Sequence, residues 1–224
     1  SKELREAYQQ GAAALGSSRR KMAPRSMRDG SLLVGWGVAT ATYPVHQMPA
    51  SALAKVKADG TIQVLAGSQD LGTGTYTIMT QIAADELGVP FDAVKFDLGD
   101  SPYPETPVSG GSMTAASTGS AVKLACAKLR AQLEALKKAN PGVSDLGELV
   151  NRTGKPELVA EHKTELAKDH DKYSMHSHGA VFAEVKVDED LGIIRVSRVV
   201  AAYAAGKILN AKTARSQLIG GIVW

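Results

Sequence analysis

The most informative stretch of the sequence is GSQDLGTGTYTIMTQIAADELGVP, residues 67–90. Glycines recur through its first eight residues and leave the backbone free to turn. The apolar residues that follow recur at helical spacing, and Gly88 and Pro90 end the pattern. The stretch therefore predicts a glycine-rich loop that leads into an amphipathic helix.

Two extended runs precede this loop, at residues 52–57 and 61–66, and they flank Asp59-Gly60, a dipeptide that suits a tight hairpin turn. The remaining elements follow from similar patterns. Helices are expected at 4–15, from 114 to 140, at 144–151 with Ser144 as N-cap, and from Asn210 onward; strands are expected at 32–43, 94–100, 181–187 and 193–203, with one more in the polar connection that runs to Lys172. Helices and hairpins in this order predict an α+β fold of mixed sheets packed with helices.

The first glycine-rich loop, Gly67 to Thr75, presents backbone N–H groups at a helix start, where an anion is favoured. It lacks the lysine of a Walker loop and the GxGxxG spacing of a dinucleotide fold. A phosphate-like or polar ring ligand suits it. The alternative is a tight strand-to-helix turn capped by a threonine.

A second segment of small residues, GGSMTAASTGS at 110–120, also leads into a helix. Its backbone N–H groups and hydroxyls can surround a phosphorylated ligand. The alternative is a small-residue helix that packs tightly on a neighbour.

Composition narrows the classes of function. The chain has 224 residues, of which 44% are hydrophobic and 22% charged, so it can bury a core. A net charge of +3 does not point to nucleic acid, and no apolar run is long enough to cross a membrane. We therefore expect a soluble chain without nucleic-acid or membrane partners. The apolar end, SQLIGGIVW, predicts that the chain is a piece of a longer protein.

Three further features are given structural interpretations. The single cysteine, Cys126, excludes an internal disulfide or a thiolate metal cluster, and its apolar helix predicts a buried, inert thiol. His176 and His178 alternate on a strand but lack a third ligand, so no metal is assigned. The basic residues between Arg19 and Arg28 are expected in a solvated loop, although they also suit phosphate or a partner's carboxylates.

Four segments in collinear order resemble the molybdenum-binding subunit of the xanthine dehydrogenase and aldehyde oxidase family. They are SQDLGTGTYTIMTQIAADELGVP, GGSMTAASTGSAV, VFAEVKVDEDLGIIRVSRVVAAYAAGKILN and ARSQLIGGIVW. The resemblance is strongest to the bacterial aldehyde oxidase branch. Thr73 departs from the eukaryotic xanthine dehydrogenase pattern, which has glutamine at that place.

The resemblance implies a role for each matching residue. In this family the second lobe of the subunit helps to bind molybdopterin, in bacteria often as the cytosine dinucleotide. The cofactor-binding residues it implies are Leu71, Gly72, Thr73 and Gly74 at the pterin or its phosphate, Thr114, Ala115, Ala116, Ser117, Thr118 and Gly119 around the phosphate or nucleotide, and Gln217 at the pterin. The family's catalytic glutamate belongs to a GxGE-type motif beyond Trp224, so no catalytic base is named.

The resemblance also implies how the chain works within a larger enzyme. Residues 1–224 would be a fragment of the second molybdopterin-binding domain, with sub-lobes 1–142 and 143–224. Its partners would be the first lobe of the same subunit, iron–sulfur and flavin (FAD) subunits, and a small aldehyde or N-heterocycle that is hydroxylated with oxygen from water. The isolated fragment would be inactive. The compartment, cytoplasm or periplasm, stays open, as do the alternatives of a non-catalytic nucleotide-binding module and a structural assembly domain.

Overall fold

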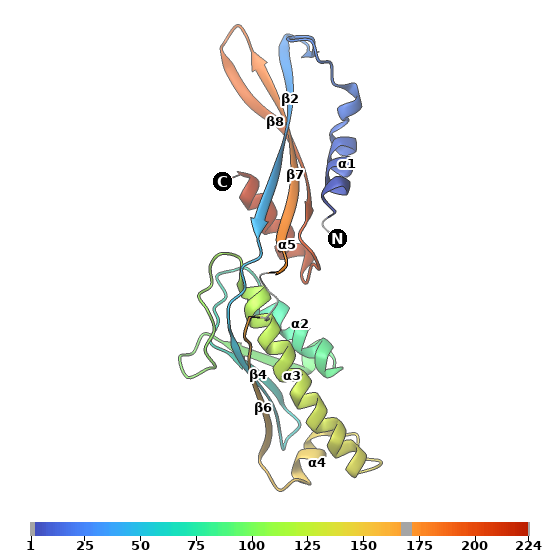
Figure 1. The fold of residues 1–224 in the computed structure, drawn as a ribbon, viewed down its shortest axis with the longest axis vertical. Helices are drawn as coiled ribbons and strands as arrows, with labels where there is room; N and C mark the ends of the chain where they lie inside the picture. Colours follow the sequence, from blue (N-terminus) through green and yellow to red (C-terminus); the bar gives the residue numbers. More distant parts are fainter. Residues whose placement is uncertain (1–2, 167–171, 224) are drawn as a thin grey trace. The chain divides into compact units, whose positions relative to one another are not determined.

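The computed structural model describes residues 3–166 and 172–223 and divides into two compact units. Unit 1 comprises Ser1–Val45 and Ser174–Lys207, and unit 2 comprises His46–Tyr173 and Ile208–Trp224. Each unit has a sheet with helix packed on it, which confirms the α+β fold (Figure 1).

Unit 1 is built on a four-stranded antiparallel sheet in the order β1-β2-β7-β8. The strands are β1 (Arg28–Asp29), β2 (Leu32–Pro44), β7 (His176–Asp188) and β8 (Ile193–Ala204); helix α1 (Leu4–Leu15) packs on one face of β7 and β8 (Figure 1), and the short 3-10 helix η1 (Ser17–Arg19) follows it. Its small core joins Ala7 and Leu15 of α1 to Ala180 and Phe182 of β7. Strands far apart in sequence thus form one sheet.

Two sets of hydrogen bonds cap the C-terminus of α1. Gly16 adopts a φ of 87°, and its amide donates to the carbonyls of Ala12 and Ala13. The guanidinium of Arg198, on β8, donates to the carbonyls of Ala14 (2.6 Å) and Leu15 (3.4 Å). A cation at this end also complements the helix dipole.

Unit 2 is built on a second four-stranded sheet in the order β5-β4-β3-β6. The strands are β3 (Ser51–Lys57), β4 (Ile62–Ala66), β5 (Val94–Leu98) and β6 (Glu157–Lys163). Helix α2 (Thr75–Leu87) connects the parallel pair β4 and β5, with the 3-10 helix η2 (Phe91–Ala93) before β5, and the long helix α3 (Thr114–Ala139) packs beside α2 (Figure 1). Alternate residues of the strands and the inner faces of α2 and α3 form the main core.

The remaining elements of unit 2 are two helices. Helix α4 (Leu146–Asn151) begins at Asp145, whose carboxylate accepts the Glu148 amide at 2.7 Å, so Asp145 and not Ser144 is the N-cap. Helix α5 (Ala211–Val223) begins after Asn210, whose side-chain oxygen accepts the Lys212 and Thr213 amides. No helix in the described part of the chain is long and apolar enough to span a membrane.

The division into units differs from the expected sub-lobes 1–142 and 143–224. Strand β6 lies in the expected second sub-lobe, yet it pairs with β3 from Ser51↔Lys163 to Lys57↔Glu157. Strand β7 lies there too, yet it pairs with β2 along its whole length. The expected connection that runs to Lys172 includes residues 167–171, which lie outside the described residues.

Candidate functional site

The starts of α2 and α3 lie at the same edge of the unit 2 sheet. Strand β4 ends at Ala66 and leads into the loop before α2, and the antiparallel strand β3 begins at this edge. The residues just before β3 contact the first turns of α3. The Met48 amide donates to Ser117 Oγ at 3.0 Å, and Gln47 Nε2 donates to the Ala116 carbonyl at 3.4 Å.

Two hydrogen bonds join the loop before α2 to the segment that leads into α3. Ser109 Oγ donates to Gln69 Oε1 at 2.7 Å, and the Gly67 amide donates to the Pro104 carbonyl at 2.7 Å. An added Cβ at Gly67 would lie 2.9 Å from that carbonyl oxygen, so this position requires glycine. The loop before α2 and the segment that leads into α3 therefore lie side by side.

The loop before α2 supplies its own anion. The carboxylate of Asp70 accepts the amides of Gly72 (2.9 Å), Gly74 (3.2 Å) and Tyr76 (3.2 Å). Gly72 and Gly74 have φ of 91° and 85°, positive values that glycine adopts readily. These three N–H groups are consequently paired within the chain. The N-cap residue of α2 is Gly74, which has no side chain to cap the helix, and the Tyr76 amide in the first turn is accepted by Asp70 rather than by the threonine of the alternative interpretation.

Electrostatics at Asp70 follow from these contacts. Partial burial acts to raise the pKa of its carboxyl, but the backbone N–H donors of Tyr76, Gly74, Gly72 and Thr73 outweigh burial, and the pKa is lowered. A carboxylate that accepts several amides at a helix start is stabilised in its charged form.

The start of α3 is arranged differently. Its N-cap residue, Met113, provides no side-chain cap, and its first turn contains no acidic residue. Gly111 and Ser112 just before it both have a φ of 57°, Ala115 is exposed and Thr114 is half-buried. No described side chain caps the N–H groups at the start of this 26-residue helix, so an external anion suits this position.

Ser117, Thr118 and Gly119 are buried within unit 2. Ser117 Oγ accepts the Met48 amide, whereas Thr118 Oγ1 has no hydrogen-bond partner among the described residues. An added Cβ at Gly119 would lie 2.9 Å from Ile82 Cδ1, so this glycine allows α2 and α3 to pack closely. The small-residue packing alternative therefore describes Gly119.

The other predicted residues are accessible. Leu71, Gly72 and Thr73 are exposed, Gly74 is half-buried, and an added Cβ at Gly74 would lie 3.1 Å from the Thr213 methyl at the start of α5. Gln217 is exposed on α5. The sequence analysis missed three contributors to this site, Asp70, Gln47 and Met48; an aspartate in the loop four residues before the N-cap is a usable signal for the first.

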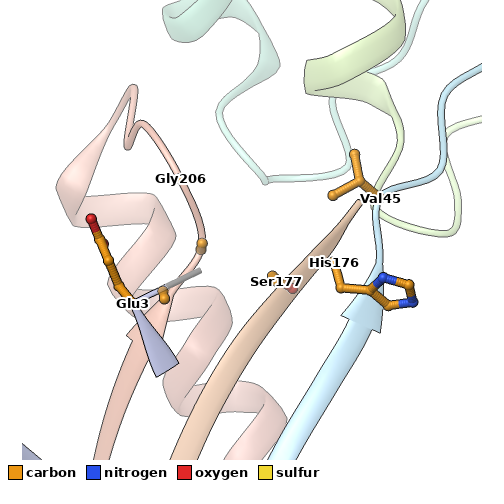
Figure 2. A pocket seen from close by; sticks show the side chains of 7 residues that line it. Glu3, Val45, His176, Ser177 and Gly206 are labelled. Carbon is orange, nitrogen blue, oxygen red and sulfur yellow. The ribbon is translucent and has the colours of Figure 1, made fainter. Parts of the chain in front are cut away.

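Unit 1 contains a separate pocket of about 350 Å³ near Val45 and Gly206. Figure 2 shows Glu3 at one side of this pocket and the imidazole of His176 turned outward at the other. The rings of His176 and His178 lie 6.4 Å apart, and within residues 3–166 and 172–223 no group of three His, Cys, Asp or Glu side chains could hold a metal ion. None of the predicted cofactor residues lines this pocket.

Cys126 and the basic cluster have structural surroundings. The thiol of Cys126 is fully buried, and burial, with a smaller contribution from Glu86, raises its pKa to about 12. This confirms the prediction of a buried, inert thiol. In the basic cluster, Arg25 and Arg28 both pair with Glu189 on the β7–β8 turn.

Comparison with known families identifies the domain. The sequence profile of the molybdopterin cofactor-binding domain matches residues 10–224. The chain belongs to this family. The resemblance inferred from the four sequence segments is thereby confirmed, and molybdopterin is the family's cofactor.

Individual relatives agree with this family assignment. The chain is 36% identical over 232 residues to the aldehyde oxidoreductase molybdenum-binding subunit PaoC of Escherichia coli strain K12, covering 99% of this chain and 32% of PaoC. It is 26% identical to the nicotine 6-hydroxylase large subunit of Paenarthrobacter nicotinovorans, covering 77% of this chain and 24% of that protein. The chain thus spans about a third or less of these relatives.

Solved structures share the fold. Carbon monoxide dehydrogenase of Oligotropha carboxidovorans superposes with a TM-score of 0.81 at 20% identity, over 97% of this chain and 32% of that one. Aldehyde oxidoreductase of Desulfovibrio gigas superposes with a TM-score of 0.71 at 24% identity, over 98% of this chain and 24% of that one.

The residues present fit the family's cofactor. Molybdopterin carries a phosphate, and the start of α3 offers uncapped N–H groups with no competing carboxylate in its first turn. The buried hydroxyl of Thr118, a few residues along the same helix, lacks a partner. The donors are thus neutral backbone and hydroxyl groups, which suit an anionic, oxygen-rich ligand.

Proposed function

We propose that this chain is a segment of the molybdenum-binding subunit of a molybdenum hydroxylase, and that it holds the phosphate end of molybdopterin at the edge where α2 and α3 begin. The observation that carries the proposal is the uncapped start of α3 beside the glycine-rich loop of α2. One helix start has an internal anion, Asp70, and its neighbour has none.

The two loops have different roles in this proposal. Backbone N–H groups from Thr114 to Ala116 bind the phosphate, and the uncharged surroundings leave that interaction without a competing carboxylate. Leu71, Gly72, Thr73 and Gly74 present backbone to the pterin, and their geometry is fixed in advance by the Asp70 carboxylate. Ser117, Thr118 and Gly119 act from within the fold by holding the first turns of α3 in place, with the Thr118 hydroxyl left for the ligand.

Gln217 completes the proposed contacts. It lies exposed near the middle of α5, and its amide can both donate to and accept from a pterin ring. In the cytosine dinucleotide form, the nucleotide would extend from the phosphate at the start of α3, where Gly110 leaves room for it: an added Cβ at Gly110 would meet nothing within 4 Å.

The wider activity follows from the relatives. PaoC is the molybdenum-binding subunit of an aldehyde oxidoreductase. The second relative is the large subunit of nicotine 6-hydroxylase, and nicotine is an N-heterocycle. We propose an aldehyde or N-heterocycle as substrate, a first lobe elsewhere in the same subunit, and iron–sulfur and FAD subunits as electron-transfer partners. When bound, the cofactor supplies the oxygen transfer and redox chemistry, while this chain supplies binding and orientation. The isolated chain is then expected to purify without molybdenum and without hydroxylase activity, which metal analysis and a substrate assay check.

The test of the phosphate site is Ala115→Asp in the intact subunit, with Ala115→Asn as the matched control. An aspartate in the first turn stabilises the helix but repels a phosphate at its N-terminus. Molybdenum content should fall roughly tenfold or more in the aspartate variant, because like charges this close at a protein surface cost more than about 1.4 kcal/mol. The asparagine variant should keep most of its molybdenum.

The two variants should have the same far-UV circular dichroism, and the aspartate variant should melt at a temperature no lower than that of the asparagine variant, so that a loss of molybdenum in the aspartate variant reports on binding and not on unfolding. Equal molybdenum content in both would show that the start of α3 does not hold the phosphate. Equal loss in both would show that the side chain at this position matters for its size and not for its charge, which also contradicts the proposal.

A further inference from the structure

The two sheets differ on the face that their helices do not cover. In unit 2 this second face carries Leu53, Leu65 and Val159 but is mostly polar: Lys55 Nζ lies 3.3 Å from Glu157 Oε2, and Gln63 Nε2 donates to Asp97 Oδ2. An antiparallel or mixed sheet with one apolar and one polar face is typical of a domain whose second face meets water. Unit 2 therefore gives an internal reference for a solvated face.

The second face of the unit 1 sheet has the opposite character. On β7, Ala180 and Phe182 point toward α1, so the alternate residues Val181, Ala183 and Val185 point away from it. None of these three outward residues is polar. Around Ala180 and Phe182 the central strand is therefore apolar on both faces, whereas Glu184 and Lys186 place charged side chains on the α1 side.

The neighbouring strand β2 continues the same face. Its register places Gly35, Gly37 and Ala39 beside the three outward residues of β7. Gly37 and Ala39 are exposed, and a Cβ added at Gly37 would meet nothing within 4 Å. The centre of the face is therefore flat, built from small residues, and open in this structure.

The edge strand β8 forms the rest of the unit 1 face that points away from α1. Val196 and Val199 lie beside the outward residues of β7, and both fall on the same face because the pairing shifts by one residue at Ser197. Val196 is 65% exposed, and Ile194 on the same face is 70% exposed. No described element of unit 1 packs on this side. We call the surface of β2, β7 and β8 opposite to α1 the apolar face.

We infer that the apolar face is covered in the intact subunit by a segment of the same polypeptide outside these 224 residues. A sheet that is apolar on both faces is normally buried on both, and an exposed apolar surface of this extent marks an interface. The inference rests on the proposed function in one respect only, that the chain is a segment of a longer subunit. The relative PaoC has about two thirds of its length outside the matching region, which is ample to cover the face.

The composition of the face favours a permanent cover over a partner that binds and leaves. Interfaces between proteins that also exist apart are about as polar as ordinary surface, whereas permanent ones resemble a domain core cut in half. The apolar face contains no charged or hydrogen-bonding side chain between Leu33 and Ala41 of β2, or at the outward positions 179–187 of β7. Such a face matches a core shared within one polypeptide.

The first test compares two neighbouring positions on β2 in the intact, cofactor-loaded subunit. Ala39→Cys places a thiol on the apolar face, and Thr40→Cys places one on the opposite side of the same strand; both positions are exposed in this structure. Each variant is treated with a maleimide under native conditions, and labelling of the β2 peptide is measured by mass spectrometry. The thiol at 39 should react roughly tenfold or more slowly than that at 40, because a buried thiol reacts only through local opening. Equal rates would overturn the inference.

The second test identifies the occupant. A photoreactive aliphatic amino acid replaces Val196, and the cross-linked peptides of the native subunit are sequenced by mass spectrometry. Links to the same polypeptide outside residues 1–224 are the expected result. Links to residues of this chain, to a second copy distinguished by isotope labelling, or to another polypeptide would overturn the assignment of the occupant.

Molybdenum content of the same samples separates this inference from the proposed function. A protected thiol at 39 in a subunit that never contains molybdenum would support the covered face and contradict the proposed cofactor site. A freely labelled thiol at 39 in a subunit with full molybdenum content would contradict the covered face and support the proposed cofactor site.

Discussion

The two glycine-rich loops of unit 2 look alike in sequence but leave their helices in different electrostatic states. The loop before α2 folds around the carboxylate of Asp70, which takes three backbone amides. The loop before α3 provides no side-chain cap and no acidic residue in the first turn. A glycine-rich loop at a helix start is therefore open to an external anion only when the chain does not supply one itself.

The largest effect is expected from removing the internal anion. Asp70→Ala leaves three amides without their acceptor and should lower the free energy of unfolding by about 2–3 kcal/mol, since each hydrogen bond to a charged group contributes substantially. Urea unfolding followed by far-UV circular dichroism measures it. Asp59→Ala is the control, because Asp59 accepts one amide, that of Thr61, and should cost about 1 kcal/mol or less. Equal losses would show that Asp70 is not the organising group of its loop.

The pH dependence of the free energy of unfolding should show whether the negative charge of Asp70 stabilises the loop. Its pKa in the folded chain lies below the unfolded value, so its stabilising contribution is complete above the unfolded pKa of about 4 and is lost as pH falls through the folded pKa. Wild type should exceed Asp70→Asn in stability by about 1–2 kcal/mol at neutral pH, and the difference should vanish in acid. A difference that stays constant down to pH 2 would contradict the role of the charge.

The start of α3 is tested by a pair of hydroxyl deletions. Ser117→Ala removes the acceptor of the Met48 amide and should cost about 1 kcal/mol, whereas Thr118→Val removes a hydroxyl with no partner in the chain and should change stability by less than about 0.5 kcal/mol. In the intact subunit, Thr118→Val should lower molybdenum content although stability is unchanged. Unchanged molybdenum in that variant would assign Thr118 to packing alone.

The smallest effect is expected from alanine substitutions of glycines, which test whether Gly72 serves the cofactor or only the turn. Gly72 and Gly88 both have positive φ and space for a Cβ, so Gly72→Ala and Gly88→Ala should each cost about 1 kcal/mol. Only Gly72→Ala should also weaken cofactor retention, measured as molybdenum lost on dialysis of the intact subunit. If both variants retain the cofactor equally, the glycine at 72 serves only the turn.

The features that the sequence predicts correctly are local. Helix α1 begins and ends where its apolar spacing and Gly16 indicate, and the hairpin of β3 and β4 forms at Asp59-Gly60. These depend on residues a few positions apart. The pairing of β2 with β7, which sets Leu33 opposite Val187, joins segments separated by the first segment of unit 2, His46–Tyr173, and no local pattern specifies it.

The same distinction applies to the site. The positive φ of Gly72 and Gly74 follows from residue type. The burial of Ser117 to Gly119 does not, because it depends on where α2 packs against α3. The sequence analysis missed Asp70 because it assigned the backbone amides of this glycine-rich loop to a ligand. An aspartate in such a loop can accept hydrogen bonds from the same amides in place of a ligand.

The discontinuity of unit 1 has a consequence for biosynthesis. Its first segment ends at Val45, and its second begins at Ser174. At a synthesis rate of about 5–20 residues per second, β2 would wait roughly 6–26 s before β7 begins to emerge from the ribosome, and the first segment of unit 2 would emerge in the interval. The exposed early strand is thus an expected client of nascent-chain chaperones, and a ribosome-profiling experiment on chaperone occupancy should show binding that begins after β2 emerges and ends once Arg198 is available to close α1.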